Sequence, residues 1–110
     1  MANFGAKDLI MQGEEGDSYI RINSTSRHNI SIQAILEGDN ITAAALLLEG
    51  SLDNIHYCEL LTHILTAEDI AMGCSLFHIA NKTVTTVKIT IQTLTGDANA
   101  RMSVFGVGMG

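Results

Sequence analysis

The chain has 110 residues and carries 12 acidic against 6 basic side chains, for a formal net charge of −6. This length suits one domain with a single core, and a surface of this sign repels nucleic-acid phosphates and anionic lipids. We therefore expect neither a nucleic-acid nor a membrane partner, and the apolar run 41–48 is far shorter than the roughly 20 residues that cross a bilayer. The chain contains no Pro and no Trp, and its abundance of Ile, Val, Thr and Ala favours strands.

Residues 1–16 show weak periodicity and no apolar stretch of signal-peptide length, so we expect an N-terminal arm on a protein made and kept in the cytoplasm. The β-sandwich domain is expected over residues 17–110. Apolar side chains of the arm are candidate anchors on a neighbouring subunit, although frayed termini are the commoner outcome. These anchors are Phe4, Leu9, Ile10 and Met11.

Alternation of apolar and polar residues predicts strands along the rest of the chain. The clearest example is 29–36, where Ile30, Ile32 and Ala34 share one face. The predicted strands lie at 19–22, 29–36, 42–49, 56–61, 74–80, 83–92 and 99–107. Seven to eight short strands separated by turn residues predict an all-β fold, an antiparallel two-sheet β-sandwich or jelly roll.

The predicted strand 42–49 is apolar on both faces. Ala44, Leu46 and Leu48 take one side, and the other side holds Ala43, Ala45 and Leu47. Ile35, in the strand before it, also lies outside the core phase. We favour burial by a second subunit, with Ile35 and Leu47 at the contact. A β-bulge that changes the phase of the strand is the alternative.

Two local signals follow in the chain. Asp53 and Asn54 lie between two strand patterns and tolerate the left-handed backbone of a reversal, so they predict a β-hairpin. Thr66 is suited to an N-cap, acidic residues follow it, and Gly73 is suited to a left-handed C-cap. We expect one short helix near residues 66–72, bridging the two sheets.

Two His/Cys pairs are the candidate metal ligands. His56 and Cys58 lie two residues apart, and Cys74 and His78 lie four apart, but no C-x-x-C knuckle is present. We interpret the cysteines as small buried hydrophobic residues and the histidines as surface or satisfied polar residues. A zinc site and a Cys58–Cys74 disulfide remain the alternatives. No nucleophile motif, paired-carboxylate motif or phosphate loop is found, so we expect no enzyme, no metal and no cofactor.

Several stretches together resemble small β-sandwich virion proteins of tailed bacteriophages. They are EGSLDNIHY at 49–57, LTAED at 65–69, VKITI at 87–91 and ARMSV at 100–104. In that group a hairpin of the form EGSxDGxxW/Y precedes a late strand pair, and discoidin-like sandwiches have a similar hairpin. The resemblance covers residues 42–107. Asn54 stands where Gly is usual, and Tyr57 where Trp is frequent.

The resemblance implies a capsid cement or decoration protein without catalytic residues. Such a protein is assembled in the host cytoplasm, lies on the virion surface and binds the major capsid protein, often as a trimer. The alternatives are a carbohydrate-binding module for host attachment and a tail or connector subunit. Sugar sites usually present exposed aromatic rings, and this chain offers only Tyr19 and Tyr57 beside its three Phe.

Overall fold

The computed structural model describes residues 8–23, 29–80 and 84–109. Within them the chain forms eight strands and one helix. In order these are β1 (Asp8–Gly13), β2 (Ser18–Asn23), β3 (Asn29–Glu37), β4 (Ala43–Ser51), β5 (Cys58–Ile64), α1 (Ala67–Met72), β6 (Cys74–Ile79), β7 (Thr86–Thr95) and β8 (Arg101–Met109).

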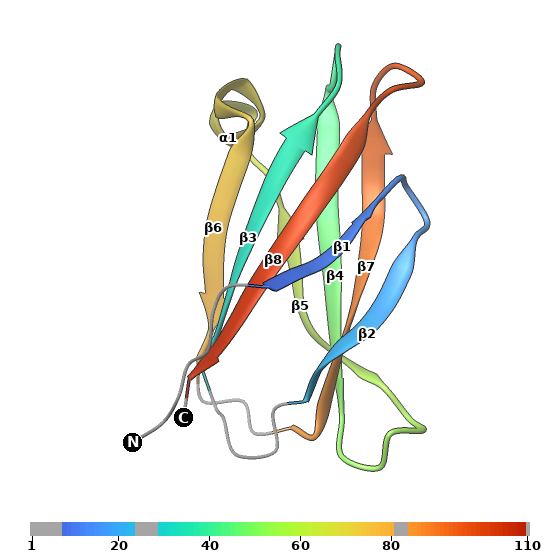
Figure 1. Cartoon of the computed structure of the whole chain (residues 1–110), viewed down its shortest axis with the longest axis vertical. Helices are drawn as coiled ribbons and strands as arrows, with labels where there is room; N and C mark the ends of the chain where they lie inside the picture. The colour runs from blue at the N-terminus through green and yellow to red at the C-terminus, as the bar shows by residue number, and fades with distance from the viewer. Residues whose placement is uncertain (1–7, 24–28, 81–83, 110) are drawn as a thin grey trace.

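The strands form two antiparallel sheets of four strands each. Sheet A has the order β1-β8-β3-β6, and sheet B has the order β2-β7-β4-β5. Figure 1 shows sheet A passing in front of sheet B, and the shortest molecular extent of 19 Å fits two stacked layers. The predicted all-β, two-sheet sandwich is confirmed.

The core lies between the sheets and follows the predicted alternation. Ile30, Ile32 and Ala34 of β3 are fully buried, as are Val87 and Ile89 of β7. Each strand exposes its alternate residues on the outer face of its sheet because successive side chains point to opposite sides. The period-2 pattern therefore identified the inner faces of both sheets correctly.

Part of the expected N-terminal arm is a strand of the domain. β1 pairs with β8, with a bulge between Leu9 and Met11. Ile10 and Met11 are 4% and 9% exposed and belong to the core. They are therefore not available as anchors on a neighbour, and the domain begins by residue 8 rather than 17. The bulge explains the missed prediction, since it interrupts the alternation by which strands are recognised.

Bulges also occur beside β4, but not within it. The β4–β7 ladder skips Gln92, and the β4–β5 ladder skips Leu60. β4 therefore alternates without interruption, and Leu47 faces outward between Thr90 and Thr62. A change of phase within β4, the alternative to a contact, is not observed.

The predicted helix is confirmed as α1. The Thr66 hydroxyl accepts from the Asp69 N–H, the Asp69 carboxylate accepts from the Thr66 N–H, and Gly73 ends the helix at φ 80°. α1 links β5 of sheet B to β6 of sheet A, as expected of a bridging helix. None of the described helical residues forms a segment long and apolar enough to cross a membrane.

Candidate binding site at the β4–β5 hairpin

The loop between β4 and β5, residues 52–57, projects from one end of the sandwich (Figure 1). β4 and β5 pair antiparallel on either side of it, so the predicted hairpin is confirmed. Asn54 has φ 63°, the left-handed conformation that Asn tolerates better than most residues. The connection between β4 and β5 has six residues rather than the two of a tight turn.

The Asp53 carboxylate organises this loop. Its Oδ1 accepts from the backbone N–H groups of Ile55 and His56, both at 2.8 Å, and from the Ser51 hydroxyl at 2.9 Å. Its Oδ2 lies 2.7 Å from Nδ1 of His56. The Ser51 hydroxyl also accepts from the Asn54 N–H at 2.8 Å. One carboxylate and one hydroxyl therefore satisfy three backbone donors of the turn.

These hydrogen bonds determine the charge of the loop. The His56 ring, followed by the N–H groups of His56 and Ile55, holds the pKa of the Asp53 carboxyl well below its usual range. Asp53 therefore stays ionised at all but strongly acidic pH. The order it imposes is present above the ordinary carboxyl pKa, about 3.9, and is lost only as the pH falls further.

The start of β7 holds the loop from a second side. The Thr85 N–H donates to the Ser51 carbonyl at 2.8 Å, and the Thr85 hydroxyl donates to the Leu52 carbonyl at 3.0 Å. The Thr86 hydroxyl donates to Oδ1 of Asn54. The loop is thus bound both within itself and to the neighbouring strand.

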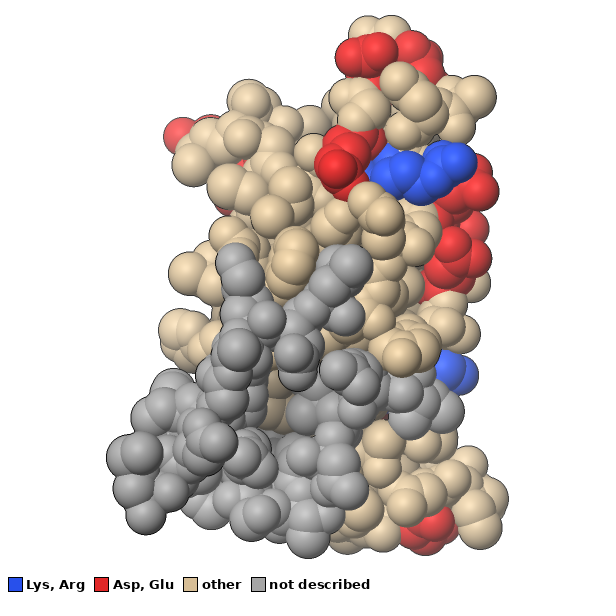
Figure 2. Space-filling view, viewed as in Figure 1, with Lys and Arg blue, Asp and Glu red and all other residues tan. Residues whose placement is uncertain are grey.

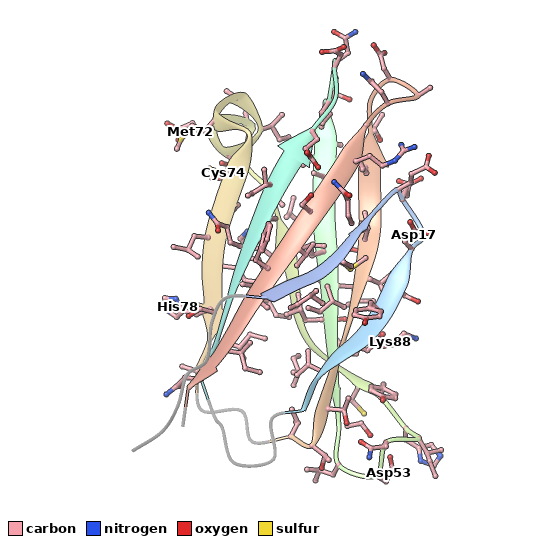
Figure 3. The ribbon with its side chains drawn as sticks, viewed as in Figure 1. Asp17, Asp53, Met72, Cys74, His78 and Lys88 are labelled. Carbon is pink, nitrogen blue, oxygen red and sulfur yellow. The ribbon has the colours of Figure 1, made fainter. Side chains whose placement is uncertain are left out.

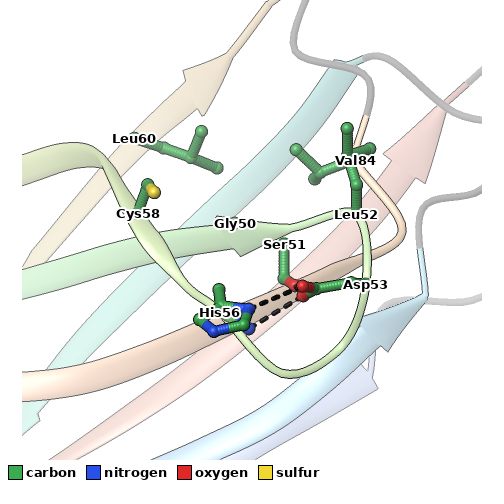
Figure 4. A pocket seen from close by; sticks show the side chains of 8 residues that line it. All are labelled: Gly50, Ser51, Leu52, Asp53, His56, Cys58, Leu60 and Val84. Atoms are coloured by element: carbon green, nitrogen blue, oxygen red, sulfur yellow. Dashed lines mark hydrogen bonds and ion pairs between the residues drawn. The ribbon is translucent and has the colours of Figure 1, made fainter.

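A pocket of about 370 Å³ lies behind the loop (Figure 4). Its lining residues are Gly50, Ser51, Leu52, Asp53, His56, Cys58, Leu60 and Val84. A Cβ at position 50 would lie 2.9 Å from both Leu60 Cδ1 and Val84 Cγ1, which is closer than side-chain carbons approach. A larger residue at position 50 would therefore have to displace Leu60 and Val84 from the walls of the pocket, which favours glycine where the sequence reads EGS.

The polar groups of the pocket brace a turn rather than form a nucleophilic relay. In a serine hydrolase the histidine lies between the serine and the aspartate. Here Ser51 and His56 bind the same carboxylate from two sides. Among the described residues, no three His, Cys, Asp or Glu side chains come together as a possible metal site. The absence of metal and of enzymatic activity stays a prediction.

The structure does not contain the Cys58–Cys74 disulfide that the sequence left open as an alternative. Both Cys58 and Cys74 are free. Cys58 begins β5 beside the hairpin, whereas Cys74 begins β6 after α1, so the length of β5 separates them. A disulfide requires Cα atoms about 4.4–6.8 Å apart. Cys58 is exposed rather than buried, and His56 is exposed as expected.

Two large apolar side chains lie on the loop itself. Leu52 and Ile55 are 74% and 75% exposed. Asp53 is labelled at this end of the molecule in Figure 3. The loop therefore presents apolar groups to solvent from a backbone that is already hydrogen bonded.

The remaining predicted contact residues lie on different faces. Ile35 of β3 lies between Ser103 and Cys74 on the outer face of sheet A. Leu47 lies on the outer face of sheet B, so one flat contact cannot include both residues. Both are partly exposed, and their role in a contact stays a prediction. Phe4 and the side chain of Leu9 are outside the described part of the chain.

Sequence reasoning missed a partly buried cluster at α1. Nε2 of His63 lies 2.9 Å from the Ser75 hydroxyl, and the His63 ring stacks on Phe77 with centroids 3.9 Å apart. The Thr66 N–H is the main cause of the lowered pKa of the Asp69 carboxyl, and His63 and Ser75 contribute to the same lowering. In the sequence, the polar residues at positions 63, 69 and 75 are the only indication of this cluster.

The comparisons with known proteins give fold likeness only. No protein-family model matches the chain, and no curated protein matches it. The SPBc2 prophage-derived protein YomS is similar at TM-score 0.58 and 8% identity, covering 94% of this chain and 90% of YomS. The module CBM32-3 from a Clostridium perfringens family 31 glycoside hydrolase is similar at TM-score 0.53 and 13% identity, covering 94% and 91%. At these identities the likeness shows a shared β-sandwich.

Proposed function

We propose that this protein is a non-enzymatic structural component of a bacteriophage virion, a cement or decoration protein that binds the capsid shell as an oligomer. The observation that carries the proposal is the braced loop 52–57, with Leu52 and Ile55 exposed at its surface. The sequence resemblance to phage virion sandwiches lies on this same hairpin. The fold likeness to a prophage-derived protein agrees with that origin.

Preorganisation is the physical reason to assign the loop to protein binding. Ordering a free loop on binding costs free energy, which offsets part of the favourable free energy of the interface. Here the hydrogen bonds of Asp53, Ser51 and Thr85 order the backbone in advance. Burial of the Leu52 and Ile55 side chains against a capsid shell would then contribute favourably to the free energy of binding, with little loss of loop entropy. The same contact would be made at every equivalent site of the shell.

The test is cosedimentation with purified capsids that lack the protein. Wild type should pellet with the capsids and saturate at a fixed ratio to the shell subunits. Replacing both Leu52 and Ile55 by Ser should weaken binding by about tenfold or more, because buried aliphatic area is lost. The matched control is Ile64→Ser, which removes an equally large and 69% exposed side chain from β5. Equal losses in both variants, or no binding by wild type, would overturn the assignment.

A carbohydrate-binding module is the second candidate. The pocket supports it, since it combines the polar groups of Ser51, Asp53 and His56 with an apolar wall, and the fold resembles CBM32-3. Against it, the ammonium of Lys88 lies over the Tyr57 ring, 6.0 Å from its centre, so one face of this ring is already occupied. Saturable binding on a glycan array, abolished by His56→Ala, would favour this candidate over the shell.

A further inference from the structure

The four edge strands of the sandwich are not protected equally. The edges are β1 and β6 of sheet A and β2 and β5 of sheet B. Bulges interrupt the ladders that β1, β2 and β5 make with their neighbours. β6 pairs with β3 in unbroken register from Cys74 to Ile79. Since bulges are a common protection against strand addition, β6 is the one described edge without that protection.

The composition of β6 is a second reason to expect that another strand can pair with its free edge. The strand reads CSLFHI and contains no Asp, Glu, Lys, Arg, Gly or Pro. Leu76, at its centre, is 72% exposed. Met72, Cys74 and His78 are labelled along the β6 side of the molecule in Figure 3. Outside the grey atoms, Figure 2 shows no red or blue side chain on this side below α1. Charged edge residues, the usual obstacle to pairing, are absent from this strand.

The hydrogen-bond pattern shows which backbone groups of β6 face outward. The Leu36 N–H donates to the Gly73 carbonyl at 2.8 Å, directly before the β3–β6 ladder. Antiparallel ladders alternate between bonded and non-bonded pairs. In the register of this ladder, Ser75, Phe77 and Ile79 therefore bond to β3. The N–H and C=O groups of Cys74, Leu76 and His78 point away from sheet A, and among the described residues no other strand pairs with β6.

We propose that β6 pairs antiparallel with β6 of a second copy of this chain, around a two-fold axis at Leu76. This register opposes Leu76 to Leu76 of the second copy, and Cys74 to His78 at both ends. It is the register that uses all three outward-facing residues of each strand, with two hydrogen bonds in each pair. The two sheets A become one continuous sheet of eight strands, and the Leu76 side chains become neighbours.

A second copy fits this edge better than an unrelated peptide. With a net charge of −6, copies of this chain repel one another over most of their surface. The uncharged strand places no carboxylates opposite each other in the pair. A two-fold contact also uses the same patch on both partners and closes at two subunits, so it does not extend into a fibre. The inference is independent of the proposed capsid role.

Two substitutions at position 76 test the contact by sedimentation velocity or light scattering on the purified protein. Leu76→Lys adds a charge to the edge. Leu76→Pro removes an N–H that points away from β3, so it leaves the β3–β6 ladder intact. The matched control is Ile64→Lys, on the other exposed edge nearby.

Wild type is expected at twice the 11.8 kDa chain mass, and both position-76 variants should associate about tenfold or more weakly while keeping a wild-type β-sheet spectrum. The Ile64→Lys control should remain dimeric. A wild type that stays monomeric up to about 1 mM would overturn the proposal, and so would equal dissociation of the control.

Cross-linking tests the register. In a Cys58→Ser, Cys74→Ser background, Leu76→Cys should form a disulfide-linked dimer with glutathione disulfide as the oxidant, because opposed Cα atoms lie about 5.5 Å apart. His78→Cys in the same background should form no disulfide-linked dimer, since the two residues 78 are then several positions apart. Equal cross-linking of both variants would contradict the two-fold at Leu76.

Discussion

The hairpin loop and the α1 corner use the same chemistry at different depths. In the loop, Asp53 accepts backbone N–H bonds next to His56, and the His56 side chain is 83% exposed. In the α1 corner, defined by His63, Thr66, Asp69, Ser75 and Phe77, Asp69 accepts the Thr66 N–H, and His63 packs on Phe77 between the sheets. Asp53 therefore orders the backbone of an exposed loop. Asp69 instead caps a helix beside a histidine that stacks on a core phenylalanine. Substitutions in the corner should change global stability, whereas substitutions in the loop should change local order.

The largest effect is expected from Phe77→Ala. Phe77 is 8% exposed, and its ring supports both the core and the stacked His63. Its removal leaves a cavity, which should lower the free energy of unfolding by about 3–5 kcal/mol in urea denaturation. The control is Ile64→Ala on β5, where the 69% exposed side chain should contribute less than about 0.5 kcal/mol. Similar losses in the two variants would contradict this account of the corner.

The next effect concerns the capping box of α1. Thr66→Ala leaves the Asp69 N–H without its side-chain acceptor, which should cost about 1 kcal/mol in the same assay. Thr66→Ser keeps the hydroxyl and should stay near wild type. If Ser proves as damaging as Ala, the methyl group rather than the cap is responsible.

The pH dependence of stability should reflect the burial of His63. Burial lowers the pKa of His63, although the nearby Asp69 carboxylate opposes this effect. A lowered pKa means that the folded state favours the neutral ring. The stabilisation is therefore present above the unfolded-state pKa, about 6.5, and is lost as the pH falls below it.

Melting temperatures measured from pH 8 to pH 5 check this expectation. The decline between about pH 6.5 and pH 5 should be smaller in His63→Gln than in wild type. A steeper decline in His63→Gln would show that the ring is stabilised by protonation in the folded state.

The smallest effect on global stability is expected from Asp53→Asn. The loop contributes little buried area, so the free energy of unfolding should stay close to that of wild type. The amide hydrogens of Ile55 and His56 should nevertheless exchange faster, because the charge that holds them is gone. His56→Gln removes only the ring contact and should change these exchange rates less. Unchanged exchange in Asp53→Asn would mean that the β7 contacts alone order the loop.

Features encoded within a few neighbouring residues were predictable. The caps of α1 at Thr66 and Gly73 follow from short-range hydrogen bonds and a left-handed backbone. The inner faces of β3 and β7 follow from a period of two. β1 escaped detection because its bulge breaks that period, and because its pairing with β8 joins opposite ends of the chain.

The candidate site was predictable in part. The sequence located the hairpin and its turn residue Asn54, but not the pocket behind it. That pocket forms only when Val84, from the segment before β7, meets Leu60 over Gly50. Its walls come from segments far apart in the chain, so no local pattern reports them.

The sequence by itself determined the class of the fold, the inner faces of its strands and the position of the helix, because these depend on alternation and on local hydrogen bonds. Only the tertiary structure decided which strands are edges, that Ile35 and Leu47 lie on opposite faces, and that β6 leaves its outward N–H and C=O groups unpaired by any other described strand. The physical reason is strand order: pairing between distant segments determines each strand's neighbours, and a strand carries no local signal of which neighbour it lacks.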